Sequence, residues 1–284
     1  MSSSRVSFIT GGSSGLGYAI ADAALAGGGT ALLGAQRTRL LDPLIKRYPG
    51  RVIAYPLEVT KLEQIEAAAT AAVGRFGVPA NNAGQGQLGA LEETSDAELH
   101  QLFDVHVFGP VALIRAVLPV IRRQRSGAIV QMSSGFGRYS ALGLSAYSAT
   151  KFALEGLSQA LAAEAEPFGI RVPVDELGAL RTSILGQAFH HSRNMPEYEE
   201  ITSSVRGMLA GLNGGQPGDP AKAAVAILTV LNSDHPPLRP PLGIDALDGI
   251  RDEIAVTSKE LDTCGALSRA TTFDNVSDPI EGSS

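Results

Sequence analysis

The sequence predicts an α/β fold, a doubly wound parallel sheet with helices on both faces, held in a single domain. Short apolar runs alternate with helical stretches, and this alternation is typical of a parallel sheet covered by helices. Glycine supports the same reading: 32 of the 284 residues are glycine, whereas roughly 7% is usual, and many stand between these runs. We expect strands over 6–10, 30–35, 51–57 and 128–132, and helices over 15–26, 40–48, 62–76, 96–123, 145–168 and 221–231.

The expected domain covers residues 1–245, and a C-terminal helical extension with a flexible tail covers 246–284. Within the domain, residues 183–215 have few periodic signals, so we expect a mobile substrate lid of short helices there. The extension has apolar residues that would line one face of a helix. These are Leu247, Ile250, Ile254 and Leu261.

Composition excludes several classes of protein. The chain has 23 basic and 29 acidic residues, a net charge of −6, which argues against non-specific nucleic-acid binding. A single cysteine, Cys264, excludes a disulfide framework and fits a reducing compartment, so we expect a cytoplasmic protein. No uncharged apolar window reaches 18 residues, and residues 1–5 run directly into a strand, so we expect neither a membrane span nor a signal peptide. We expect no metal site, because no Cys or acidic residue partners His106 at metal spacing.

A glycine loop between the first strand and the first helix carries the strongest local signal. It reads Thr10-Gly11-Gly12-Ser13-Ser14-Gly15-Leu16-Gly17. Residues without Cβ let backbone amides approach a pyrophosphate, and the helix N-terminus attracts its negative charge. An ordinary glycine-rich turn is the alternative, and the missing Gly-Lys-Ser/Thr ending disfavours a P-loop. We expect dinucleotide contacts from Gly11, Ser13, Ser14, Gly15, Leu16 and Gly17.

The end of the second strand favours NADP(H) over NAD(H). An NAD site carries an acidic residue about 20 residues after the loop, where it binds the ribose 2′-hydroxyl. This chain has Gln36-Arg37-Thr38-Arg39 there and no acid. A 2′-phosphate would find Arg37 and, as a second choice, Arg39. The alternative is that both arginines are solvated residues at a helix start.

Tyr147 and Lys151 are four residues apart at the start of a helix, so their side chains share one face. Ser134 precedes them, just after an apolar strand, and Asn81-Asn82-Ala83-Gly84 stands in the middle of the chain. Together with the glycine loop, these motifs resemble the short-chain dehydrogenase/reductase family, in its short single-domain branch. The resemblance covers about residues 5–245 and implies a Rossmann-like fold.

The resemblance implies a role for each matching residue. Tyr147 would exchange a proton with the substrate oxygen, Ser134 would bind that oxygen, and Lys151 would hold the nicotinamide ribose. A nearby ammonium and a positively charged nicotinamide would both favour the phenolate, whereas a tyrosine otherwise titrates near 10. The remaining cofactor contacts implied by the family are Glu58 at the adenine, Asn81, Ala83 and Gly84 on the adenosine side, and Leu180 and Thr182 at the carboxamide.

The sequence departs from the family pattern at four places. His106 stands where the family has an asparagine serving a proton relay, and we expect it to take part in catalysis in an altered way. The fourth strand is reduced to 78–80, with Pro79. The sixth strand, 171–177, carries a proline and two acids, and the seventh, 237–244, is broken by two prolines. Either this half of the sheet is distorted, or turnover is impaired.

We therefore expect an NADP(H)-dependent oxidoreductase that interconverts a carbonyl and an alcohol on an apolar small molecule. A catalytically impaired dinucleotide-binding sensor or interaction protein is the main alternative, and a lyase or isomerase using the Tyr147–Lys151 pair is another. A homodimer or homotetramer is expected, because Phe152, Leu154, Leu157 and Leu161 supply apolar surface that could pair between subunits.

Overall fold

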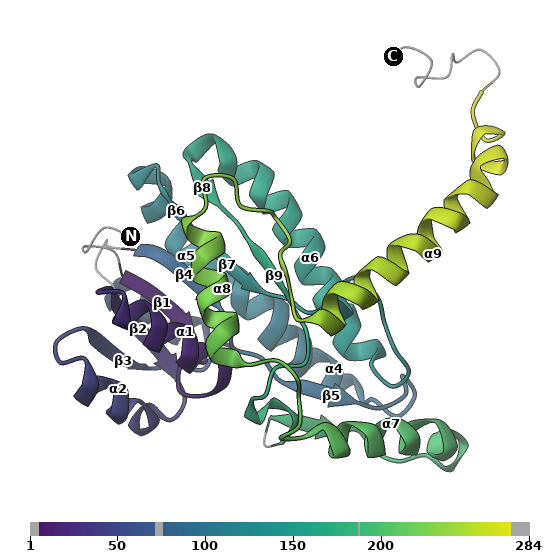
Figure 1. Ribbon diagram of the computed structural model, residues 1–284, viewed down its shortest axis with the longest axis horizontal. Coiled ribbons are helices and arrows are strands. Elements are labelled where there is room, and N and C mark those ends of the chain that lie inside the picture. The colour runs from purple at the N-terminus through teal and green to yellow at the C-terminus, as the bar shows by residue number, and fades with distance from the viewer. Residues whose placement is uncertain (1–5, 72–75, 187, 274–284) are drawn as a thin grey trace.

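The computed structural model describes residues 6–71, 76–186 and 188–273, and it contains a seven-stranded parallel sheet (Figure 1). The strands run in the order β11-β9-β7-β4-β1-β2-β3. Their bounds are β1 (Val6–Thr10), β2 (Thr30–Ala35), β3 (Val52–Pro56), β4 (Phe76–Asn81), β7 (Val130–Met132), β9 (Val174–Leu177) and β11 (Pro241–Leu242). Every neighbouring pair is parallel, which confirms the predicted doubly wound sheet.

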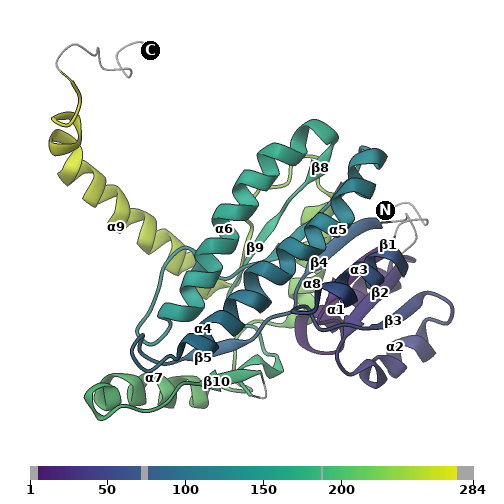
Figure 2. The same cartoon turned by 180° about the vertical axis from the view of Figure 1, so that it is seen from behind.

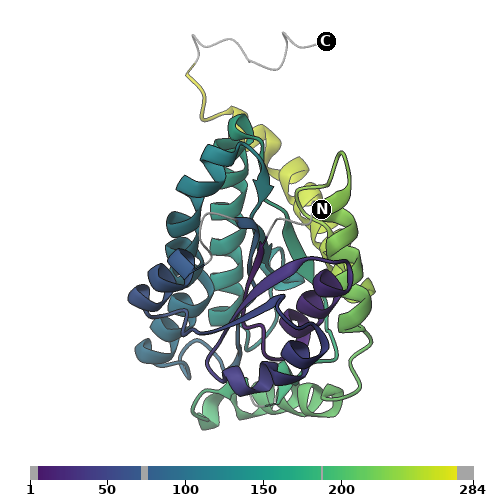
Figure 3. The same ribbon diagram turned by 90° about the vertical axis from the view of Figure 1, so that its left-hand side faces the viewer.

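Helices cover both faces of the sheet, as Figure 3 shows along its edge. One layer comprises α1 (Gly15–Ala26), α2 (Asp42–Arg47) and α8 (Pro220–Asn232), and the other comprises α3 (Leu62–Ala71), α5 (Gly109–Gln124) and α6 (Ser145–Ala165). A separate apolar cluster fills each interface, with Ile20, Leu33 and Ile227 on the first side and Phe8, Val117 and Leu161 on the second. Both clusters use alternate residues of the strands, because successive side chains of a strand point to opposite faces.

The strand order reverses between β1 and β4, which lie side by side at the centre of the sheet. Loops leaving the carboxyl ends of these two strands diverge to opposite faces, and such a switch point is where ligands bind in open α/β sheets. The glycine loop follows β1 and the Asn81–Gly84 segment follows β4, so both predicted motifs reach this point.

The expected shortening of the fourth strand is wrong. β4 has six residues and pairs along β1, with Phe8 opposite Pro79. Its pairing with β7 begins only at Ala80, opposite Val130, so the ladder on that side does not include the proline. The strand is therefore complete despite a residue that lacks a backbone donor.

The other two irregular segments also form strands. The sixth is divided into two pieces, β8 (Ile170–Arg171) and β9, and Pro173 lies between them. β8 pairs with β6 (Gly127–Ala128). The seventh is reduced to β11 at the sheet edge. Backbone amides of Val174 and Glu176 donate to the carbonyls of Leu238 and Pro240. An edge segment that accepts hydrogen bonds tolerates prolines, because it needs no donor on its outer side.

The stretch Asp96–Gln124 is one long helical segment composed of α4 (Asp96–Phe103), the π-helical η2 (Asp104–Phe108) and α5. A capping box between Ser95 and Glu98 fixes its start. By length and composition alone it could cross a membrane, with a mean hydropathy of 1.6 in its most apolar window. Half of that window is buried in the fold, as in the core helix of a globular protein.

The lid region and the extension are helical in part, as expected. The lid contains η5 (Ser183–Leu185), β10 (Phe189–His191), η6 (Pro196–Tyr198) and α7 (Glu199–Leu212), and β10 pairs with β5 (Gly86–Leu88). The extension forms α9 (Ile244–Arg269), which projects away from the body (Figures 1 and 2). Of its apolar residues, Ala246 and Ile250 are buried, whereas Ile254 and Leu261 are exposed. The expected flexible tail lies mostly outside the described residues.

Candidate active site

The glycine loop has the backbone that a close approach to a phosphate requires. Gly11 and Gly15 have φ values of +65° and +54°, which side chains rarely adopt. A Cβ on Gly17 would lie 2.4 Å from Asn82 Nδ2 and 2.5 Å from Gly11 O. Ser14 is the N-cap of α1, yet its side chain makes no capping hydrogen bond. The amides of this helix start therefore fit the pyrophosphate of a dinucleotide, because nothing from the Ser14 side chain competes for them.

Two residues of the quoted motifs for which no contact was predicted, Thr10 and Asn82, bind the loops after β1 and β4 to each other. The Thr10 hydroxyl accepts hydrogen bonds from the amides of Asn82 and Ala83, both at 3.0 Å, and Asn82 Nδ2 donates to Thr10 O at 2.9 Å. Asn81 differs from its neighbours: its side chain is buried and donates to Gln131 at 2.7 Å. Any contact of Asn81 with a cofactor would therefore come from its backbone.

Arg37 and Glu58 lie at the ends of β2 and β3, which are adjacent strands. Arg37 is exposed, and the neighbouring Gln36 donates a hydrogen bond to the Glu58 carboxylate. Glu58 also accepts from Thr60. The two residues predicted for the adenosine end are thus brought to one edge of the sheet, although they are 21 positions apart in the chain.

Ser134, Tyr147 and Lys151 converge beyond the end of β7. Ser134 is the N-cap of η3 (Gly135–Gly137), and its hydroxyl donates to Leu177 O at 3.3 Å. Tyr147 and Lys151 lie in the first two turns of α6, where Lys151 Nζ is 5.8 Å from the centre of the Tyr147 ring. Lys151 is buried and donates to Met132 O at 2.9 Å. Three of the four predicted catalytic residues therefore form one cluster.

Burial governs the proton affinities in this cluster. It raises the pKa of Tyr147 above its ordinary value, while a hydrogen bond with Ser134 acts in the opposite direction. Burial lowers the pKa of Lys151 to about 8, and the Glu155 carboxylate acts to raise it. The Tyr147–Lys151 pair predicts a lowered Tyr147 pKa. In the protein without a bound cofactor this prediction is not met, because desolvation outweighs any effect of the ammonium. At neutral pH Tyr147 carries its proton.

His106 lies in the π-helical turn η2, and both of its ring nitrogens are engaged. Nε2 accepts from the Gln85 amide at 3.1 Å, so the proton of the neutral ring is on Nδ1, which lies 2.9 Å from Thr150 Oγ1. Thr150 in turn donates to Tyr147 O at 2.7 Å. Burial, and then the Lys151 charge, holds the pKa of His106 well below its usual value. The ring thus links the loop after β4 to α6 in its neutral form, and its part in proton transfer stays a prediction.

The segment after β9 carries Leu180 and Thr182 toward the glycine loop. A Cβ on Gly15 would lie 3.2 Å from Thr182 Cβ, and the Thr182 hydroxyl accepts from Ile184 N at 3.4 Å. Asp245, at the start of α9, accepts from Ala179 N at 2.7 Å. Asp245 and Ala179 are 66 positions apart and come into contact only in the folded chain. No sequence motif therefore points to Asp245.

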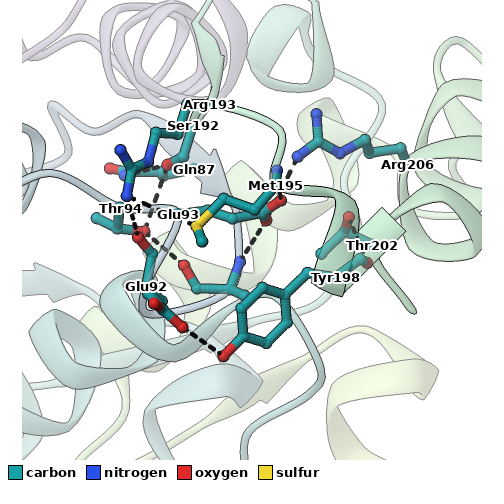
Figure 4. Close-up of polar contacts among 11 residues, drawn as sticks. Gln87, Glu92, Glu93, Thr94, Ser192, Arg193, Met195, Tyr198, Thr202 and Arg206 are labelled. Carbon is teal, nitrogen blue, oxygen red and sulfur yellow. Dashed lines mark hydrogen bonds and ion pairs between the residues drawn. The ribbon is translucent and has the colours of Figure 1, made fainter. Parts of the chain in front are cut away.

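The segment expected to form the lid is attached to the loop after β5 by a polar cluster (Figure 4). Glu93 is fully buried and accepts from the amides of Ala90 at 2.8 Å and Met195 at 3.0 Å. Arg206 of α7 lies 3.5 Å from the same carboxylate. These contacts and the charges of the arginines lower the pKa of Glu93 despite its burial. Among the described residues, no group of three metal-ligating side chains was found.

Comparisons with known proteins agree with this site. Residues 5–193 match the family model for short chain dehydrogenase. A short-chain dehydrogenase structure from Streptomyces avermitilis is 46% identical, with a TM-score of 0.90, and covers 96% of this chain and 100% of that one. Oxidoreductase BOA17 of Botryotinia fuckeliana is 36% identical over 86% of this chain and 90% of its own length. Human retinol dehydrogenase 8 is 32% identical over 76% of this chain and 70% of its own.

More distant structures share the fold and contain nicotinamide cofactors. A Burkholderia cenocepacia enzyme in complex with NADP is 22% identical (TM-score 0.72; 93% of this chain, 98% of that one). A Burkholderia phymatum enzyme in complex with NAD is 20% identical (TM-score 0.78; 89% and 95%). With the Ser134–Tyr147–Lys151 cluster at the end of the sheet, these matches show that the chain belongs to the short-chain dehydrogenase/reductase family and is an NAD(P)-dependent oxidoreductase.

Proposed function

We propose that the protein is an NADP(H)-dependent oxidoreductase that interconverts a carbonyl and an alcohol on an apolar small molecule, with Tyr147 as the acid and base. The observation that carries this proposal is the convergence of Ser134, Tyr147 and Lys151 beyond the carboxyl end of β7, which is the neighbour of β4 at the switch point. A protein that only binds the dinucleotide has no need of this cluster.

The bound cofactor supplies the hydride to the carbonyl carbon. Tyr147, neutral at working pH, donates its hydroxyl proton to the carbonyl oxygen, so the product is the alcohol, and in the reverse direction it takes the proton back. The Ser134 hydroxyl donates to the same oxygen and stabilises its developing negative charge. Lys151 holds the ribose and stabilises the phenolate left after proton donation. His106 keeps α6 and the loop after β4 in position around the Tyr147 ring.

The glycine loop, Gly11 to Gly17, binds the pyrophosphate, and the backbone of Asn81, Ala83 and Gly84 borders the adenosine side. Arg37 binds the 2′-phosphate and so favours NADP(H), with Glu58 next to it at the adenine. Leu180 and Thr182 bind the carboxamide. The exposed position of Arg37 at the end of β2, with no acid on that strand end, supports the preference.

Exposed apolar side chains on the expected lid and on the loop before α6 support an apolar substrate. These are Leu142 in the loop after η3, and Ile201 and Met208 on α7. The name of the human relative, a retinol dehydrogenase, points to the same chemical class. We further propose a cytoplasmic homodimer or homotetramer. Phe108 and Phe152 are exposed and available for such contacts, whereas Leu154 and Leu161 are buried within the chain.

The test is to compare the wild type with Tyr147→Phe using NADPH and a panel of apolar ketones and aldehydes. We expect the variant to bind NADPH as the wild type does and to lose about 10²- to 10⁴-fold in turnover. Tyr55→Phe, in β3 at the far edge of the sheet, is the matched control and should retain activity. Undiminished reduction by Tyr147→Phe would refute the acid role, and tight NADPH binding without turnover on any carbonyl would favour the sensor alternative.

A further inference from the structure

We propose that Glu155 is a positioning residue of this active site, whose carboxylate is the counter-charge that keeps the buried Lys151 ammonium protonated. The inference rests on the proposed function, in which Lys151 holds the cofactor ribose and supports Tyr147. It concerns a residue that lies behind the cluster and touches neither substrate nor cofactor.

Glu155 lies one helical turn after Lys151 on α6, so both side chains project from the same face. They are 4% and 7% exposed. A Cβ on Gly137 would lie 3.0 Å from Glu155 Cγ, 2.9 Å from Ser133 Oγ and 3.2 Å from Lys151 O. The turn that follows Ser134 therefore packs directly on the part of α6 that carries Lys151 and Glu155.

The position of the Glu155 carboxylate is fixed by a residue from the C-terminal segment. Arg239 Nε donates to Glu155 Oε2 at 2.8 Å, and Arg239 Nη2 donates to Gln159 at 2.8 Å. The second oxygen, Glu155 Oε1, finds no hydrogen-bond partner among the described residues. A buried carboxylate oxygen without a donor is costly, and a nearby ammonium reduces that cost.

Arg239 is shared between Glu155 and a second carboxylate, Glu176 of β9, which lies 3.8 Å from it. Glu176 also accepts from Arg138 at 2.7 Å, so these four residues form one charged cluster. Arg138 follows the Ser134 turn, and Glu176 precedes Leu177, whose carbonyl accepts from Ser134. The cluster thus joins the three segments that carry the proposed catalytic and carboxamide-binding residues.

Of the described groups that act on the Lys151 ammonium, Glu155 is the one with the opposite charge. Tyr147 is neutral, His106 of η2 is neutral, and β7 presents the Met132 carbonyl. Burial lowers the Lys151 pKa to about 8, even though the Glu155 charge acts to raise it. Without this carboxylate the ammonium would be buried with no opposite charge beside it, and it would lose its proton at a lower pH.

The experiment measures NADPH affinity by cofactor fluorescence, together with initial rates of carbonyl reduction, from pH 5.5 to 9.5. In Glu155→Gln we expect the pH at which affinity and turnover decline to move down by about one unit or more. Near pH 6 the variant should approach the wild type, because Lys151 is protonated in both. Glu155→Asp, which keeps the charge, should restore most of the wild-type profile.

Glu164→Gln, the same change at an exposed position of α6, is the matched control and should leave the profile unmoved. If Glu155→Gln does not fold, Glu155→Met/Arg239→Met replaces the ion pair by apolar side chains, a change that buried pairs often tolerate. It should show a downward shift that is smaller, because loss of the Arg239 charge acts in the opposite direction. A Glu155→Gln profile that superimposes on the wild type, or that is weaker by one factor at every pH, would overturn the inference. A wild type that does not bind NADPH would instead overturn the proposed function.

Discussion

Asn82 occupies the space that a side chain on Gly17 would need, because its Nδ2 lies 2.4 Å from the position of a Cβ there. The same amide donates to Thr10 O at 2.9 Å. The loops after β1 and β4 are therefore packed through Gly17, and the proposed pyrophosphate site depends on the lack of a side chain at this position.

Gly17→Ala should weaken NADPH binding by about tenfold or more and destabilise the fold by roughly 1–3 kcal/mol, because the added methyl group forces the two loops apart. Cofactor titration and thermal unfolding measure the two effects. Gly156→Ala is the control: that glycine of α6 has nothing within 4 Å of its Cβ position, so the change should stabilise by about 0.5–1 kcal/mol. Equal effects of the two substitutions would contradict the packing argument.

Arg37→Ser should raise the Kd for NADPH by about 10- to 100-fold and leave that for NADH nearly unchanged, because only NADP(H) carries the 2′-phosphate. Paired fluorescence titrations with both cofactors measure this. Arg47→Ser removes an exposed arginine that is ion-paired to Asp22 and should alter neither affinity. The prediction fails if the wild type binds NADH more tightly than NADPH.

Glu93→Gln should loosen the lid. An amide oxygen accepts less strongly than a carboxylate, and the change removes the charge that faces Arg206, so the attachment should weaken by roughly 1–3 kcal/mol. Hydrogen–deuterium exchange over 189–212 should become faster, and KM for the carbonyl should rise. Glu92→Gln is the neighbouring comparison and should have a smaller effect, because the Glu92 side chain is exposed and an amide there can still accept from the Tyr198 hydroxyl. Unchanged exchange at the Met195 amide in Glu93→Gln would contradict this role.

Asp175→Val should stabilise the protein, and increasingly so as the pH rises. Asp175 is fully buried opposite Met132, neither carboxylate oxygen has a hydrogen-bond partner in the described part of the chain, and burial raises its pKa to about 7. Between about pH 4 and pH 7 the folded chain holds a proton that the unfolded chain releases, so raising the pH favours unfolding.

The stability gained by Asp175→Val should therefore be small near pH 4 and reach the order of 2–4 kcal/mol above pH 7. Denaturant unfolding of both proteins across this range measures the difference. Asp252→Val, at an exposed position of α9, should show no such pH dependence. A constant difference between Asp175→Val and the wild type at all pH values would show that Asp175 does not titrate in this range.

The lid and the C-terminal segment show the limit of prediction from local pattern. Short helices over 183–215 could be expected, yet the pairing of β10 with β5 and the burial of Glu93 depend on elements about 100 positions apart. In the same way, Arg239 and Glu155 are 84 positions apart, and nothing in either local sequence indicates that they meet.

The sequence by itself determined the α/β class, the glycine loop, and the Tyr147–Lys151 pair on one helix face, because each follows from a local period or a conformational requirement of a few adjacent residues. Only the tertiary structure decided that β4 is complete despite Pro79 and that the neutral His106 ring joins Gln85 to Thr150. It also decided that Asp175 is buried with no hydrogen-bond partner among the described residues. Strand pairing, burial and the ionisation that follows from burial depend on which distant segments pack together. The folded chain fixes these properties, and no short stretch of the sequence contains them.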